Sequence, residues 1–205
     1  MPVLCALAAT IALQLAIPNQ YTVVPHWPLV VLELLLVAVL LTLNPVRLNR
    51  RTRIGRCASL ILVSAIVLDN TASALLLNSH ILTGKVSNDP AILLGSGGAI
   101  FLTNIIAFGI CYWELDRGGP IVRCRVTQPH PDFMFPQMSS PELAPNGWAP
   151  KFYDYLYVSV TNVMAFSPTD TMPLARWAKM LMTAQALVAV STIALVFARA
   201  VNVLG

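Results

Sequence analysis

The candidates for a functional site in this sequence are polar residues that lie within long apolar runs. Four of them form a candidate intramembrane site: Asp69, Asn70, Thr71 and Asn104. A carboxylate near the middle of a bilayer costs about 2.5–3.5 kcal/mol on insertion scales, so Asp69 should face the interior of a helical bundle. There it either handles an ion or a proton together with its polar neighbours, or joins two helices through a hydrogen bond.

Other polar residues in apolar runs have simpler interpretations. Glu33 stands about one helical turn from the start of its run, where a long side chain can extend its charge to the interface. Gln185, Ser191 and Thr192 lie in the last run and either line a polar path or hydrogen-bond across helices. Asp170 follows a Ser-Pro-Thr sequence and is typical of a turn before a helix.

No pattern in the sequence indicates an enzyme or a bound cofactor. It contains no phosphate-binding loop, no Gly-x-Gly-x-x-Gly motif and no His-Glu-x-x-His motif. His26 and His80 are predicted to lie on the same side of the membrane as the end of the apolar run that carries Glu33. The three residues could form a metal site, but nothing in their spacing demands one. We therefore expect no enzymatic activity, no cofactor and no metal.

Composition places the chain in a membrane. Of its 205 residues 57% are hydrophobic and only 11% are charged, whereas globular domains carry roughly 25% charged residues. The apolar residues also form runs long enough for a bilayer, so we expect a single membrane domain with lipid as its main partner. Five arginines between residues 47 and 56 are flanked by apolar runs, which favours a role in topology and not nucleic-acid binding.

The apolar runs predict an all-α, polytopic bundle with six spans, at residues 2–17, 29–43, 57–78, 91–113, 152–166 and 174–204. The fifth run has about 15 residues where a span needs roughly 20, so five spans plus a re-entrant helix are the alternative. Residues 1–17 form either a span or a cleaved signal peptide. The single domain, 1–205, divides into a four-span bundle (1–114), a cytoplasmic lid (115–150) and a C-terminal hairpin (151–205).

Prolines and aromatic residues set the character of the predicted lid. Six prolines fall between residues 129 and 150, which disfavours long helices and strands there. Phe133, Phe135 and Trp148 argue against a free linker, because aromatic side chains gain by burial. We expect an ordered lid that lies on the membrane surface or against the bundle.

Basic residues predict an orientation. If the loop 47–56 is cytoplasmic, the positive-inside rule places the lid on the same side and the turn 167–173 outside. Both termini are then cytoplasmic, and Arg199 lies at the inner face. Arg176 and Lys179 are among the exceptions to the rule in this arrangement, both close to a helix end.

The hairpin combines an aromatic, Ser/Thr-bearing segment, a turn and a long apolar helix. Residues 155–163 read YLYVSVTNV and residues 170–173 read DTMP. These segments resemble the pore helix and the Asp-x-x-Pro sequence of potassium-channel pore modules, although the Thr-Val-Gly-Tyr-Gly filter, whose backbone carbonyls coordinate the ion, is absent. If the protein is channel-like, the resemblance implies that it forms a homotetramer. It also implies a pore-like role for six residues: Ser159, Thr161, Asn162, Ser167, Thr169 and Asp170.

The same hairpin is similar to that of a family of bacterial integral membrane proteins of unknown function, whose hairpins open with Asp and aromatic residues and continue to a Ser/Thr-Asp turn. The residues that carry this similarity are Asp154, Tyr155, Tyr157, Ser167, Thr169 and Asp170. It implies a location in the bacterial inner membrane. Our first hypothesis is a channel- or transporter-like protein that is not a selective potassium channel. The alternative is a non-transporting scaffold or partner subunit that binds another membrane protein.

Overall fold

The computed structural model describes residues 2–22, 26–43, 53–87, 89–125, 130–165 and 170–204, most of which are helical, as the sequence predicts. The longer helices are α1 (Pro2–Ala16), α2 (His26–Leu43), α3 (Arg53–Leu82), α4 (Pro90–Leu115), α7 (Phe152–Met164) and α8 (Arg176–Leu204). The shorter elements are η1 (Asn19–Tyr21), η2 (Asp116–Gly118), α5 (Pro120–Arg125), β1 (Phe133–Met134), α6 (Pro136–Ser139), η3 (Pro141–Leu143) and β2 (Met172–Pro173).

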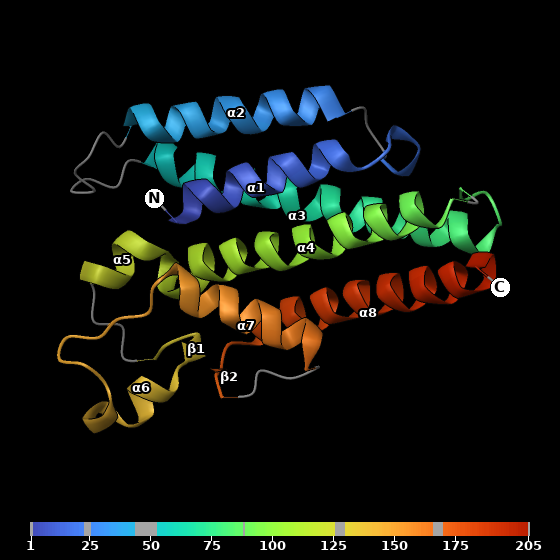
Figure 1. Ribbon diagram of the computed structural model, residues 1–205. Coiled ribbons are helices and arrows are strands. Elements are labelled where there is room, and N and C mark those ends of the chain that lie inside the picture. The colour runs from blue at the N-terminus through green and yellow to red at the C-terminus, as the bar shows by residue number, and fades with distance from the viewer. Residues whose placement is uncertain are drawn as a thin grey trace.

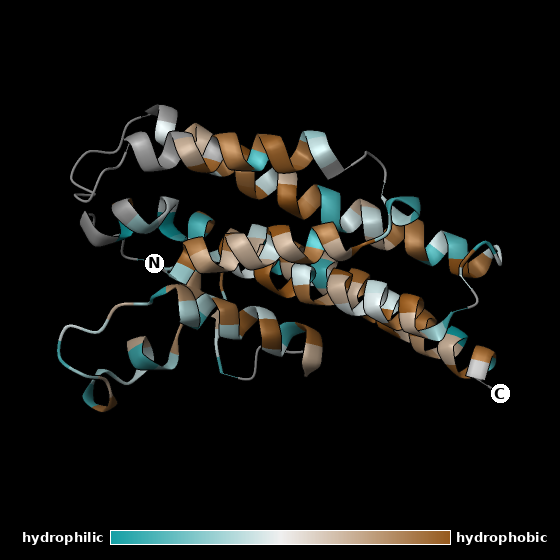
Figure 2. Cartoon of the chain, turned by 45° about the horizontal axis from the view of Figure 1, so that its top comes forward, coloured by the Kyte–Doolittle hydropathy of each residue, from teal (hydrophilic) through white to brown (hydrophobic). Residues whose placement is uncertain are grey.

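Three helices in the described part of the chain are long and apolar enough to cross a membrane, namely Gly55–Leu82, Pro90–Gly118 and Arg176–Val203. The helix Pro2–Ala16 is apolar but shorter. Figure 2 shows hydrophobic residues over most of the long helices and hydrophilic residues gathered in the lid and the connections. These features are those of a membrane protein, but three candidate spans do not establish the six that the sequence predicts.

Helix α4 is the central element of the bundle. It packs against α1, α3, α7 and α8, while α2 lies on the outside against α3 (Figure 1). Two glycines allow this crowding, because a Cβ atom at Gly97 would lie 2.8 Å from the Val196 side chain, and one at Gly109 would lie 3.1 Å from the Leu156 backbone. Small residues at such crossings let helices approach closely.

Two apolar clusters define the ends of the bundle. The first contains Leu7, Leu62, Ile110 and Phe152 and lies toward the lid, so we call this the lid end. The second contains Ile17, Tyr21, Leu77, Leu93 and Ala200 and lies at the far end. Helix α1 begins at the lid end and α8 finishes at the far end (Figure 1). The start of α1 and the end of α8 thus lie at opposite ends of the bundle, and the predicted cytoplasmic location of both termini stays a prediction.

Helix α7 does not carry the chain across the bundle. It has 13 residues, or roughly 20 Å of helix at 1.5 Å per residue. The chain then returns to the lid end, where β2 pairs antiparallel with β1 of the lid, Met172 opposite Met134 and Pro173 opposite Phe133. Figure 1 shows α7 and α8 both starting at this end. The prediction that the turn 167–173 lies on the opposite side from the lid is wrong for residues 171–173, and residues 167–169 lie outside the described part.

This return moves positive charge to the lid end. Arg176 and Lys179 begin α8 beside the lid, where Arg56 and Arg123 also lie. If the lid end is cytoplasmic, Arg176 and Lys179 agree with the positive-inside rule, whereas Arg199 lies toward the far end. A cytoplasmic lid end remains a prediction.

The re-entrant path can be tested with single cysteines in a background whose native cysteines are replaced. Ser139, Asp170 and Lys85 are exposed and suitable for labelling. We expect a membrane-impermeant maleimide to label Ser139→Cys and Asp170→Cys from the same side and Lys85→Cys from the other, because the β1–β2 pairing holds Thr171–Pro173 at the lid. Labelling of Asp170→Cys together with Lys85→Cys would contradict the re-entrant path.

Candidate functional site

A layer of polar side chains lies between the two apolar clusters. Along α3 and α4, Ile66 and Ala107 belong to the lid-end cluster, and Ala74 and Ile100 belong to the far-end cluster. The helical positions between them carry polar residues on both helices. With the residues of α1 and α2 that join them, they form what we call the polar layer: Gln14, Glu33, Asp69, Asn70, Ser73, Thr103 and Asn104.

Gln14 connects the two carboxylates of this layer. Its Nε2 lies 3.2 Å from Glu33 Oε1 and 3.4 Å from Asp69 Oδ2, so one amide group donates toward both acids. Glu33 is only 1% exposed. The interpretation of Glu33 as an interfacial glutamate is therefore wrong. The inward position of Gln14 has a weak signal in the sequence, since Gln14 and Thr10 are the polar residues of an otherwise apolar helix.

Many atoms of the polar layer have no hydrogen-bond partner within the described part of the chain. They are Gln14 Oε1, Glu33 Oε2, Ser73 Oγ, Thr103 Oγ1 and both amide atoms of Asn70 and of Asn104. Buried polar groups in native proteins are nearly always hydrogen-bonded, and each unpaired group costs about 1–3 kcal/mol. Such a concentration of unpaired groups on facing helices indicates a place where water or an ion supplies the missing contacts.

The predicted intramembrane site is therefore only partly assembled as expected. Asn70 and Asn104 are both 1% exposed and belong to the polar layer. Asp69 is half-buried and accepts from Gln14. Thr71 does not join them, because its hydroxyl donates to the Val67 carbonyl one turn earlier at 2.7 Å. A threonine in a helix commonly forms this bond with its own backbone.

Glu33 differs from the buried acids at the lid end in its charge balance. Asp116 is bonded to Arg117 and Arg123, and Glu114 is bonded to Arg56 and Ser59. Glu33 has the neutral Gln14 amide as its partner instead, and no salt bridge to it is found among the described residues. A buried carboxylate without a compensating cation is strongly disfavoured. Glu33 is therefore a candidate site for a proton or a metal cation.

The pore-like residues of the hairpin serve a different purpose. Gln185 of α8 accepts from the Tyr112 hydroxyl at 2.7 Å and from Asn162 Nδ2 at 2.8 Å, and its own Nε2 lies 2.7 Å from Ser159 Oγ. The Ser159 hydroxyl donates to the Ile105 carbonyl of α4. This closed network joins α4, α7 and α8, as expected when polar groups meet between helices in lipid.

The remaining hairpin residues do not line a path either. The Thr161 hydroxyl donates to the Tyr157 carbonyl within α7, and Asp170 is exposed. Ser167 and Thr169 lie outside the described residues. Gln185 therefore bonds across helices, and Ser191 does the same by accepting from Asn78 Nδ2 at 3.1 Å.

A second buried network orders the lid. Asp116 is fully buried and accepts from the Tyr155 hydroxyl at 2.5 Å, from Arg123 Nη1 and from the Asp132 backbone amide. Asp132 in turn accepts from the Arg117 backbone amide at 2.7 Å and from Trp177 Nε1 at 3.3 Å. These bonds tie the end of α4, the lid and the starts of α7 and α8 together. The sequence analysis did not find either aspartate, since both lie in the polar segment after α4.

Aromatic side chains complete the lid contact. Phe133 is fully buried and packs against Tyr112, Tyr155 and Trp177, with ring centroids 5.3–6.1 Å apart. Phe135 packs against Tyr155 at 5.2 Å. Contacts of this kind add stability beyond the buried area. Residues 132–135 and Trp148 therefore pack against the bundle or against each other, which is one of the two positions expected for the lid.

A scan of protein-family models, a search of curated proteins and a search of solved structures each find no match to this chain. The resemblances of the hairpin to channel pore modules and to a bacterial membrane protein family therefore remain predictions, and the interior of the bundle itself must supply the functional proposal.

The hydrogen-bond network around Gln185 predicts a stability effect. Gln185→Leu removes the common partner of Ser159, Asn162 and Tyr112, so we expect a loss of about 2 kcal/mol in the free energy of unfolding in detergent. Thr183→Ala is the matched control on the same helix, because Thr183 is exposed and, among the described residues, its hydroxyl bonds only the Lys179 carbonyl. Equal stability of the two variants would show that the network does not hold α7 in place.

Proposed function

We propose that this chain is an integral membrane protein that moves a small cation or a proton through the interior of its own helical bundle. The observation that carries the proposal is the buried acid Glu33, which Gln14 bridges to Asp69, in a polar layer with unpaired oxygens and with no salt bridge to Glu33 among the described residues. Ionisable groups at this depth are costly and usually functional.

The chemistry of the layer favours a hard cation or a proton. Its unpaired acceptors are carboxylate, amide and hydroxyl oxygens, which are the ligands of hard metal ions. An anion would be repelled by the two carboxylates. A neutral solute gains nothing from either acid. The site therefore suits a proton or a small metal cation.

Its position favours a carrier over an open pore. Apolar side chains close the bundle on both sides of the polar layer, around Ile66 and Ala107 toward the lid and around Ala74 and Ile100 toward the far end. Sites near the middle of the membrane with closed access are typical of transporters that alternate between two openings. The pore-like residues Ser159 and Asn162 are engaged in helix packing, which gives no support to a tetrameric pore built from the hairpin.

A scaffold or partner subunit is the second candidate, and the lid favours it. The lid is held by Asp116, Asp132 and a buried aromatic cluster, yet it exposes Leu143, which is 82% accessible. An ordered cytoplasmic surface of this kind could bind another protein. A scaffold of this type has no need for a buried acid without a salt bridge inside the bundle, so Glu33 and the polar layer distinguish the two candidates.

Ion movement can be tested in proteoliposomes. We expect Glu33→Gln and Asp69→Asn to fold normally, because an amide replaces the carboxyl shape and still hydrogen-bonds, but to lower the uptake of Na⁺ or of protons about tenfold or more through loss of the charge. Glu142→Gln in the exposed part of the lid is the matched control and should transport like the unmodified protein. Full uptake by both layer variants would exclude the polar layer as the route.

The absence of a glycine filter predicts a lack of potassium selectivity. Residues 164–169 contain no glycine and include Pro168, so they cannot supply stacked rings of inward-facing carbonyls. In planar bilayers we expect no preference for potassium over sodium. A reproducible single-channel current with strong potassium preference would contradict this and restore the channel interpretation of the hairpin.

A further inference from the structure

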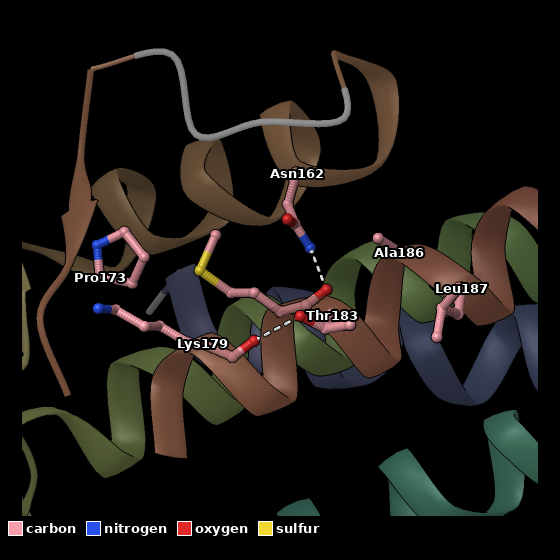
Figure 3. A pocket seen from close by; sticks show the side chains of 7 residues that line it. Asn162, Pro173, Lys179, Thr183, Ala186 and Leu187 are labelled. Carbon is pink, nitrogen blue, oxygen red and sulfur yellow. Dashed lines mark hydrogen bonds between the residues drawn. The ribbon is translucent and has the colours of Figure 1, made fainter. Parts of the chain in front are cut away.

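A cleft lies between the end of α7, strand β2 and the first half of α8 (Figure 3). Its volume is about 350 Å³, within the range of small-molecule sites. One end is polar, with Lys179 beside Pro173, and the other end is apolar, with Ala186 and Leu187. Figure 3 shows the Lys179 ammonium pointing toward Pro173 and away from Leu187.

The length of the cleft is close to the thickness of the hydrocarbon layer in one leaflet of a bilayer. From Lys179 to Leu187 the floor of the cleft covers eight residue steps of α8, or roughly 12 Å of helix. Half of a hydrocarbon core is roughly 15 Å thick. The neighbouring surface of α8 carries exposed apolar side chains, since Met180 is 73% and Leu187 is 67% exposed, and such a face suits contact with acyl chains.

Charge at the mouth of the cleft selects the headgroup. Arg176 is exposed and lies three residues before Lys179, on the same side of the helix. Both lie at the lid end, where positive residues gather, and basic pockets between helices near such a surface suit anionic lipid headgroups. Asp170 is the acidic residue nearest to Pro173 along the chain, and it does not line the cleft.

We propose that the cleft binds one anionic phospholipid of the surrounding bilayer. The phosphate lies against Lys179 and Arg176, and an acyl chain follows Met182, Ala186 and Leu187 beneath the re-entrant helix. The lipid thereby fills the space that the short helix α7 leaves beside α8.

The test compares lipids and variants by native mass spectrometry of the full chain in mixed micelles. We expect the protein to retain phosphatidylglycerol in preference to phosphatidylcholine, and Lys179→Ala to weaken the retention of phosphatidylglycerol about fivefold. Ala186→Trp, which fills the apolar half of the cleft, should weaken it as well. Lys85→Ala removes an exposed lysine at the far end and should have no effect.

Two results would overturn the proposal. Equal retention of phosphatidylglycerol by the unmodified protein, Lys179→Ala and Ala186→Trp would show that the cleft is not the site. Complete competition by glycerol phosphate alone would show that the basic residues bind a free phosphate group, with no contribution from an acyl chain.

Discussion

Burying acidic groups in an apolar bundle is the physical constraint on which this structure depends. At the lid end the constraint is met within the chain, because arginines and a tyrosine surround Asp116, and Arg56 with Ser59 surrounds Glu114. In the middle of the bundle no arginine or lysine of the described residues pairs with Glu33, which accepts from the Gln14 amide, and the buried asparagines Asn70 and Asn104 have unpaired atoms. Under our proposal, this difference separates groups that stabilise the fold from groups that bind the transported ion.

The hydrogen-bonded aspartates at the lid end also explain the path of the C-terminal region. Asp116 and Asp132 bind the starts of α7 and α8 to the lid, and the β1–β2 pair fixes the chain after its return. Helix α7 can then be short, since the Gln185 network anchors its second half to α4 and α8. A rigid hairpin of this kind supports α4, which carries part of the polar layer.

Composition and apolar runs predict the helical membrane fold, and the proline and aromatic pattern predicts an ordered lid. They do not predict the path of the hairpin, because a largely apolar helix of 13 residues fits a half-crossing as well as a short span, and the pairing of β1 with β2 distinguishes the two. Asp69, Asn70 and Asn104 are visible as polar residues in apolar runs. The same reasoning wrongly places Glu33 at the interface. Its burial depends on α1, whose Gln14 lies against Glu33, and the sequence does not show which helices lie side by side.

An experimental structure of the protein in lipid nanodiscs, at a resolution that shows ordered water, would test the polar layer most directly. Our account predicts density for water or a bound cation between Gln14 and Asn104, within hydrogen-bonding or coordination distance of Glu33 or Asp69. A dry interior in which Asn70, Asn104 and both acids bond only to one another would contradict it and favour the scaffold.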